Sequence, residues 1–185
     1  MWVPTVSAAI ASLTAGADLL GPGQLAKSGA ATVYFISGPN TKIPITSFSL
    51  AAEYGSTGYS VVSDATLGGY TTSASSLGIV ATCGTASYVA GGGALYALAG
   101  GNTTGLTASV VDAAACSVLP HSGISIATTV FLRSPSTGKI YSISGGTKHF
   151  MSTMTAIIAL NGGTVPPFVP SSDATLASIP DGAAG

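Results

Sequence analysis

A short phrase that returns twice along the chain limits the possible folds more than any single residue does. Val62-Ser63-Asp64-Ala65-Thr66-Leu67 returns as Ser171-Ser172-Asp173-Ala174-Thr175-Leu176, and a weaker version, Val110-Val111-Asp112-Ala113-Ala114, stands between them. Their aspartates are 48 and 61 residues apart. Repetition at such a period indicates copies of one supersecondary unit that bury their apolar faces against one another. The sequence therefore predicts a repeat protein.

Three tyrosine-centred segments mark the period more regularly than the aspartates do. Tyr34, Tyr88 and Tyr141 are 54 and 53 residues apart, and each stands in a short strand-like segment. A glycine-rich turn follows each segment, as a hairpin needs, and the return strands carry Lys42, Leu95 or Lys148. We expect an α+β, strand-led fold, in which three tandem repeats of β-hairpin plus short helices pack in a row or in a pseudo-threefold ring.

Helix signals follow the hairpins and complete the units. Serine and threonine residues can cap helices over 48–54 and 154–160, whereas the middle unit has a glycine-rich segment in place of this helix. The three repeated aspartates are predicted N-caps of a further short helix in each unit. The expected division is a helical lead-in (1–20), a first unit (21–77), a degenerate, disulfide-stapled second unit (78–127) and a third unit with a C-terminal linker (128–185).

The two cysteines of the chain, Cys83 and Cys116, both lie in the middle unit. An even count in a chain of secreted character favours a disulfide between them, which would compensate for the missing helix. The alternative is a pair of free, buried thiols that act as small hydrophobic residues. Both interpretations are open at this stage.

Charged residues are scarce, with five Lys/Arg, six Asp/Glu and a net charge of −1. This balance gives no electrostatic footprint for nucleic acid. No segment offers the ~18–20 consecutive apolar residues that a membrane span needs, so we expect no membrane insertion. Met1-Trp2-Val3-Pro4 lacks the basic segment of a signal peptide. A surface wetted by serine and threonine is typical of secreted proteins, and we expect a part of a larger protein that is extracellular or at the cell surface.

The sequence contains no recognisable catalytic or metal-binding motif. There are two histidines and no G-x-S-x-G nucleophile motif, and three of the six acidic residues are explained as helix caps. Two cysteines and two histidines form no recognisable zinc pattern, and one carboxylate per unit is too few for a calcium cage. We therefore predict that the chain is not an enzyme and has no cofactor and no metal site.

The aligned units resemble a repeat of extracellular proteins from actinobacteria and related bacteria. The resemblance is carried by Gly23-Gln24-Leu25-Ala26-Lys27, Val33-Tyr34-Phe35-Ile36, the Gly145-Gly146-Thr147-Lys148 turn and the repeated aspartate phrase. It spans about residues 21 to 182, and the second unit departs from it because Leu95 replaces the lysine. Such repeats accompany cell-wall hydrolases and other surface proteins, so the resemblance implies a cell-wall or glycan-binding module.

Candidate ligand-binding residues are the repeated tyrosines and the polar residues of the return strands. Aromatic rings can stack on sugars, while lysine and histidine can bond sugar hydroxyls. Alternatively, the tyrosines are half-buried core residues and the lysines protect strand edges. We expect a non-catalytic module that binds cell-wall or environmental polysaccharide; the alternative is a self-associating structural unit of a stalk, fibre or coat. The candidates are Tyr34, Lys42, Tyr88, Tyr141, Lys148 and His149.

Overall fold

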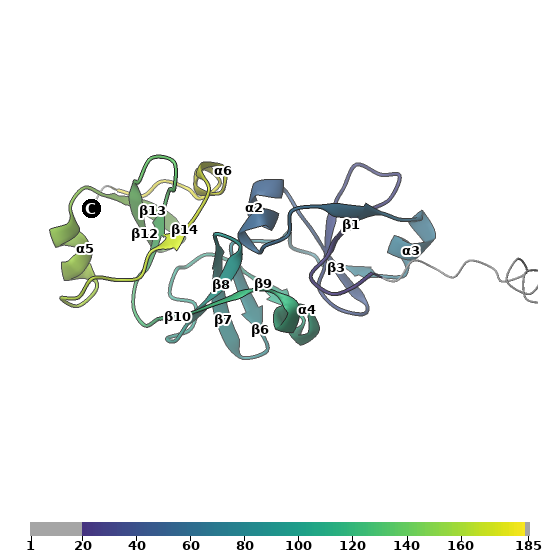
Figure 1. Ribbon diagram of the computed structural model, residues 1–185, viewed down its shortest axis with the longest axis horizontal. Helices are drawn as coiled ribbons and strands as arrows, with labels where there is room; N and C mark the ends of the chain where they lie inside the picture. The colour runs from purple at the N-terminus through teal and green to yellow at the C-terminus, as the bar shows by residue number, and fades with distance from the viewer. Residues whose placement is uncertain (1–19, 184–185) are drawn as a thin grey trace, which may run out of the picture.

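The computed structural model describes residues 20–183 and contains three β-sheets that follow one another along the long axis of the molecule (Figure 1). We call them sheets 1, 2 and 3 in chain order. Strands dominate and the helices are short, which confirms the predicted strand-led α+β class. The predicted helical lead-in lies almost entirely outside the described residues. None of the helices between residues 20 and 183 has the length and apolar character that crossing a membrane requires.

The central part of each sheet is an antiparallel meander of three consecutive strands; longer loops join the first strand to the second in sheets 1 and 3, whereas a short turn joins the second strand to the third in every sheet. Gly145 and Gly146 form one such turn with φ angles of 57° and 78°, the left-handed region in which glycine is favoured. The meander strands are β1 (Leu25–Lys27), β2 (Tyr34–Ile36) and β3 (Thr41–Pro44); β6 (Val80–Cys83), β7 (Ala86–Gly91) and β8 (Ala94–Leu98); and β11 (Val130–Arg133), β12 (Ile140–Ser144) and β13 (Thr147–Met151).

Strands that return later in the chain extend each meander in the parallel direction, which the sequence did not predict. In sheets 1 and 2 one such strand joins the first meander strand and another joins the third. In sheet 3 a parallel strand also joins the first meander strand. Beside the third meander strand there is a single parallel bridge, between Lys148 and Asp181, in place of a strand. The added strands are β4 (Tyr59–Val61), β5 (Thr71–Thr72), β9 (Ala108–Val111), β10 (His121–Ile126) and β14 (Val169–Pro170).

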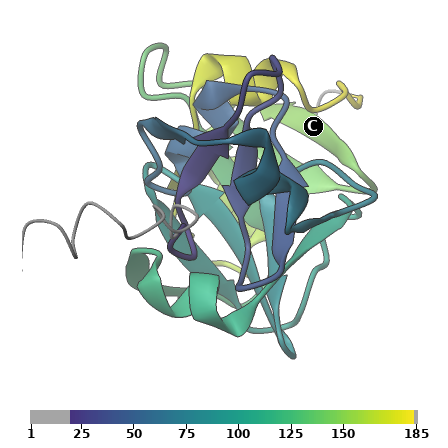
Figure 2. The ribbon, with the colours of Figure 1, turned by 90° about the vertical axis from the view of Figure 1, so that its right-hand side faces the viewer.

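The helices lie largely where the capping residues predict them. Ser47 and Thr153 cap the helices that follow the hairpins of sheets 1 and 3, and residues 99–107 of sheet 2 form no helix. In Figure 2, which looks along the long axis, α4 and α6 lie on opposite sides of the molecule. The helices are α2 (Phe48–Glu53), α3 (Asp64–Gly68), α4 (Ala113–Val118), α5 (Met154–Leu160) and α6 (Asp173–Ala177).

The prediction that all three repeated aspartates are N-caps is wrong for two of them. The side chains of Ser63 and Ser172 cap α3 and α6 by accepting hydrogen bonds from backbone N–H groups three residues on. Asp64 and Asp173 are the first residues inside these helices. Asp112 does cap α4, because the second copy of the phrase lacks a serine before its aspartate and is shifted by one residue.

One large core is shared by all three sheets. Leu25 of sheet 1, Val80 of sheet 2 and Leu132 of sheet 3 are buried in the same cluster. The opposite face of sheet 1 forms a smaller cluster under α3, and that of sheet 3 forms another under α5. Since side chains alternate between the faces of a strand, each of these sheets contributes to the shared core and to its own satellite. The sheets therefore depend on one another for burial.

Glu53 at the end of α2 joins the three sheets. Its side chain is 4% exposed, and one carboxylate oxygen accepts a hydrogen bond from the backbone N–H of Gly92 in sheet 2 at 2.9 Å. The other oxygen accepts from the backbone N–H of Ser172 at 2.7 Å, at the start of α6. Next to it, the hydroxyl of Tyr54 donates to the carbonyl of Gly78 at 2.6 Å. A carboxylate is thus buried where it satisfies donors from two other parts of the chain.

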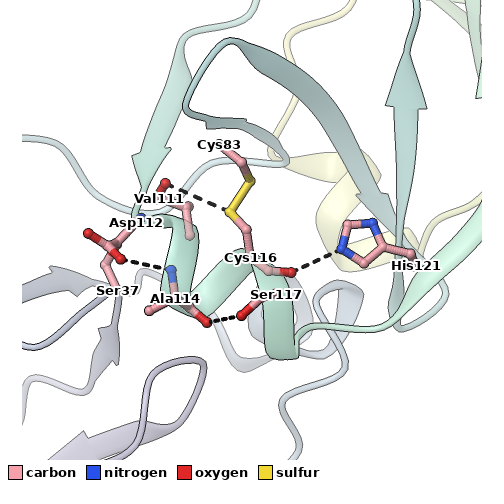
Figure 3. The surroundings of a disulfide bond; sticks show 8 residues. All are labelled: Ser37, Cys83, Val111, Asp112, Ala114, Cys116, Ser117 and His121. Carbon is pink, nitrogen blue, oxygen red and sulfur yellow. Dashed lines mark hydrogen bonds between the residues drawn. A yellow bond between two sulfur atoms is a disulfide. The ribbon is translucent and has the colours of Figure 1, made fainter.

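A disulfide between Cys83 and Cys116 confirms the predicted pairing and ties the end of β6 to α4 (Figure 3). The strand register places Cys83 where Ser134 stands in sheet 3. There the Ser134 hydroxyl donates to the carboxylate of Asp173 in α6 at 2.6 Å. In both sheets the first strand is therefore tied to the helix beside it, by a covalent bond in one and by a hydrogen bond in the other.

Glu53→Gln is expected to lower the free energy of unfolding by about 1–3 kcal/mol, because the amide NH₂ turns a donor toward backbone donors that the carboxylate now satisfies. Urea denaturation followed by tyrosine fluorescence and circular dichroism measures the change. Asp64→Asn is the matched control, since this carboxylate is exposed. A loss in Glu53→Gln no larger than in Asp64→Asn would contradict the role of Glu53 at the junction.

Removal of the disulfide in the Cys83→Ser/Cys116→Ser variant is expected to lower stability by about 3–4 kcal/mol, because the bond closes a loop of 33 residues in the unfolded chain. Thermal unfolding of the wild type with and without a thiol reductant should give the same shift in Tm. The variant should be insensitive to the reductant. Equal melting of the oxidised and reduced wild type would contradict the stabilising role.

Candidate functional site

The three predicted tyrosines occupy the same register position on the middle strand of each sheet. They pair with Ala26, Ala81 and Leu132 of the preceding strand. All three are half-buried, and each ring contacts a different neighbour. Lys42 Nζ lies 5.0 Å from the ring centroid of Tyr34, the His121 ring lies 5.3 Å from that of Tyr88, and the Phe150 ring lies 5.8 Å from that of Tyr141.

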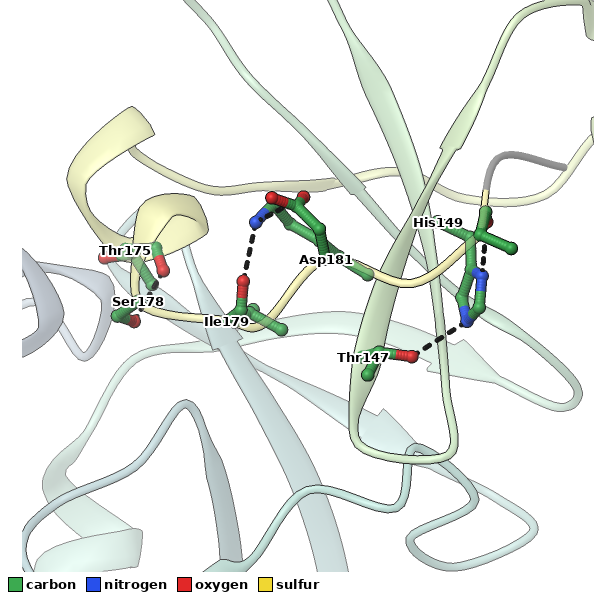
Figure 4. A network of polar contacts seen from close by, with 8 residues as sticks. Thr147, His149, Thr175, Ser178, Ile179 and Asp181 are labelled. Carbon is green, nitrogen blue, oxygen red and sulfur yellow. Dashed lines mark hydrogen bonds and ion pairs between the residues drawn. The ribbon is translucent and has the colours of Figure 1, made fainter.

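The two predicted lysines are buried, and their ammonium groups bond the chain itself. Lys42 donates to the carbonyl of Leu67 at the end of α3. Lys148 donates to the carbonyl of Ile179 after α6 at 2.6 Å and forms an ion pair with Asp181 at 2.8 Å (Figure 4). In sheet 2 the buried Leu95 holds this place. The interpretation of these lysines as solubilising edge residues is wrong, because the two residues are only 7% and 8% exposed.

His149 is half-buried beside the segment that follows α6. Its Nδ1 donates to the carbonyl of Ala183 at 2.7 Å, and its Nε2 lies 2.9 Å from the Thr147 hydroxyl (Figure 4). The imidazole also packs closely on Gly182, where an added Cβ would meet the ring at 2.3 Å. Both ring nitrogens are therefore occupied by contacts within the chain.

Two surface hollows lie at matching places in sheets 1 and 3, with volumes of about 300 and 260 Å³. Each is bounded by the start of the middle strand, the end of the third strand and the first residues of the following helix. Their linings correspond when residues are counted from the repeated tyrosines and lysines. The sheet-1 hollow is lined by Ala31, Thr32, Val33, Ile45, Thr46, Ser47 and Phe48, and the sheet-3 hollow by Thr137, Gly138, Lys139, Ile140, Phe150, Met151, Ser152, Thr153, Met154 and Ile157.

Each hollow combines an exposed apolar side chain with neighbouring hydroxyl groups. In sheet 1 this side chain is Phe48, which is 50% exposed and stacks on Tyr59 with ring centroids 5.7 Å apart. In sheet 3 the counterpart of Phe48 is Met154, which is 43% exposed. Phe150 also lines this hollow, but its ring packs on Tyr141 and points to the face of the sheet that α5 does not cover. Two successive hydroxyl residues precede Phe48 and Met154, and the second of each pair caps the helix. An apolar ring next to hydroxyls offers both stacking and hydrogen bonding to a sugar.

Sequence reasoning did not identify Phe48 or Phe150 as site residues. The repeated tyrosines drew attention to the strands, whereas the exposed rings lie at positions that differ between the units. Phe48 directly follows a predicted N-cap, and Phe150 directly follows His149 on the return strand. An aromatic residue at the exposed start of a short helix was the signal in the sequence that pointed to the sheet-1 hollow.

The carboxylate of Asp173 is the charged group with a shifted pKa near the sheet-3 hollow. Hydrogen bonds from the Ser134 and Ser136 hydroxyls lower its pKa, and the positive charge of Lys139 adds a smaller effect in the same direction. Burial of the Tyr54 phenol raises its pKa above the ordinary value, so this hydroxyl stays neutral as a donor.

No model of a known protein family matches the chain, and no curated protein matches it. Among solved structures, the periplasmic assembly from the ESX-5 inner membrane complex has a similar chain, with a TM-score of 0.25 and 12% identity. The alignment covers 91% of this chain and 61% of that chain, so the chain spans less than two thirds of its neighbour's length. At this TM-score the likeness carries no argument about fold or function.

Asp173→Asn is expected to reduce the acid sensitivity of the protein. Because the folded state lowers the pKa of this carboxyl, its stabilising contribution is present above the unfolded pKa of about 3.9 and is lost as the pH falls through the lower folded value. Urea midpoints of the wild type and the variant should therefore differ at pH 6 and converge toward pH 2. Asp64→Asn serves as the control, and a constant difference across this range would contradict the assignment.

Proposed function

We propose that the chain is a non-catalytic module that binds polysaccharide and forms part of a larger secreted protein. The observation that carries the proposal is the pair of matching hollows in sheets 1 and 3. Both combine an exposed apolar side chain, Phe48 or Met154, with adjacent hydroxyl side chains. Open, shallow hollows of this kind suit the units of an extended polymer better than a small substrate that must be enclosed for reaction.

The disulfide and the composition support a secreted location. Disulfides persist in oxidising compartments and are rare in the cytosol of most organisms. A covalent link between Cys83 and Cys116, in a chain with few charged residues, suits an extracellular or cell-surface protein. Cell-wall glycan is therefore one polymer that such a module would meet.

We further propose that the three sheets are tandem copies of one unit, laid in a row. The shared strand order of sheets 1 and 2, and its near repetition in sheet 3, support this organisation. Loss of the middle helix from the second copy explains why the hollow has no matching lining there, since residues 99–107 supply neither a helix cap nor an aromatic side chain. Binding would then be bivalent, through the first and third units.

A structural unit of a fibre or coat remains the second candidate, and α5 supports it. Six of the seven residues in this helix are apolar, and Met154 and Leu160 are 43% and 50% exposed. An exposed apolar helix face is suited to protein contacts. In this second candidate, α5 would bind another copy of the chain.

Retention on insoluble peptidoglycan, chitin and cellulose tests the first proposal. We expect wild-type protein to co-sediment with at least one polymer, and Phe48→Ala to weaken retention about fivefold to tenfold through loss of ring stacking. Met154→Ala should weaken retention by a smaller factor, because it removes an apolar contact without a ring. The double variant should lose more than either single one, because it removes both hollows. Circular dichroism verifies that each variant is folded.

Val110→Ala is the matched control, because Val110 is 78% exposed and lies away from both hollows. Its retention should equal that of the wild type. Lack of retention of the wild type on every polymer would contradict polysaccharide binding, and concentration-dependent self-association that Leu160→Asp abolishes would favour the structural candidate instead.

A further inference from the structure

Two of the three accessible cationic side chains lie together at sheet 3. The chain has five Lys/Arg residues, of which Lys42 and Lys148 are buried on backbone carbonyls. Lys27 is half-buried, with its Nζ 5.4 Å from the ring centroid of Tyr59. Arg133 and Lys139 are exposed at the two ends of the loop that joins β11 to β12. In a chain so poor in charge, this placement makes sheet 3 the most cationic part of the described surface.

Both cations border hollows that are adjacent in the sheet. Lys139 lines the sheet-3 hollow together with Phe150 and Ile140. Arg133 pairs with Ile140 across the strands and lines a smaller hollow of about 200 Å³ with Phe168 and Pro170. An anion held between the loop ends would therefore have a cation on either side, with Phe168 beside Arg133.

The acidic residue nearest to this region, Asp173, is held by other groups. Its carboxylate accepts hydrogen bonds from the Ser134 and Ser136 hydroxyls. Among residues 20–183, the one ion pair joins Lys148 to Asp181, so neither Arg133 nor Lys139 is paired with a carboxylate. Two positive charges against one negative charge leave a net positive potential at the mouth of the sheet-3 hollow.

The sheet-1 hollow lacks this charge. Counted from the tyrosines, Thr32 stands there in the place of Lys139. The two hollows therefore share apolar and hydroxyl groups but differ in charge. The same kind of ligand meets a neutral lining at one hollow and a cationic lining at the other.

We propose that the sheet-3 hollow selects an anionic sugar unit, whose acidic group pairs with Lys139 and Arg133. The sugar ring lies against the apolar lining of Ile140 and Met154. The sheet-1 hollow then takes a neutral unit. This inference rests on the proposed polysaccharide binding and names its chemistry: a glycan that carries carboxylate or phosphate groups. Arginine offers a forked set of donors that matches either group, whereas lysine acts as a point charge.

Binding of three soluble polymers to the full chain tests this inference: polygalacturonate, which carries carboxylates; a glycerol-phosphate polymer; and a neutral β-glucan of similar length. We expect tighter binding of an acidic polymer than of the neutral one, with a preference that weakens as salt is raised. Lys139→Gln and Arg133→Gln should each weaken acidic-polymer binding about fivefold and reduce the dependence of this binding on salt. Lys27→Gln is the control and should leave acidic-polymer binding unchanged.

The outcomes separate the two proposals. Preference for polygalacturonate would identify the bound anion as a carboxylate, and preference for the glycerol-phosphate polymer would identify it as a phosphate. In either case Lys139→Gln should remove the preference for the acidic polymer. Equal binding of neutral and acidic polymers, unaffected by Lys139→Gln, would overturn the anionic selection and leave polysaccharide binding intact. Failure to bind soluble or insoluble polymers would overturn both.

Discussion

The buried carboxylate of Glu53 is the contact on which the arrangement of the three sheets depends. It accepts backbone hydrogen bonds from Gly92 and Ser172, and so links α2 to sheet 2 and to the start of α6. A buried acceptor that loses its donors is costly, whereas one that keeps them defines the relative position of its donors. Apolar burial in the shared core stabilises the association of the sheets but is non-directional. The hydrogen bonds to Glu53 fix the positions of the sheets relative to one another.

Two glycines make the close approach between successive sheets possible. A Cβ at Gly38 would lie 2.8 Å from the Cβ of Asp112, and one at Gly91 would lie 2.2 Å from Cγ1 of Val169. The turn of sheet 1 and that of sheet 2 thus each pack on the segment at the start of the next aspartate helix. At the matching place in sheet 3 stands Ser144, which is exposed and carries a Cβ. The close packing of a turn glycine on the next segment, which joins sheet 1 to sheet 2 and sheet 2 to sheet 3, is therefore not possible in the same form at the turn of sheet 3.

Local signals predicted the hairpins, the two capped helices, the correspondence of Leu95 with the repeated lysines and the disulfide. These features depend on turn residues, cap residues and spacing, which the sequence displays directly. The parallel strands were not predicted, because segments as short as Thr71–Thr72 have no alternation and pair only where the chain returns to a finished hairpin. The role of Glu53 was hidden for a similar reason: its donors lie far away in the sequence, and an isolated glutamate at a helix end is usually a solvated residue.

The residues that recur in the sequence are used for contacts within the chain. Lys42 and Lys148 satisfy carbonyls in or just after the aspartate helices of sheets 1 and 3, and the buried Leu95 takes their place in sheet 2. A side chain that makes such an internal contact has little freedom to meet a ligand. Phe48 and Phe150 stand at positions whose residue type differs between the sheets; they do not make the internal contact that the lysines make, and they are exposed. If the proposed module binds a ligand, its specificity is therefore best sought at positions that differ between the three sheets.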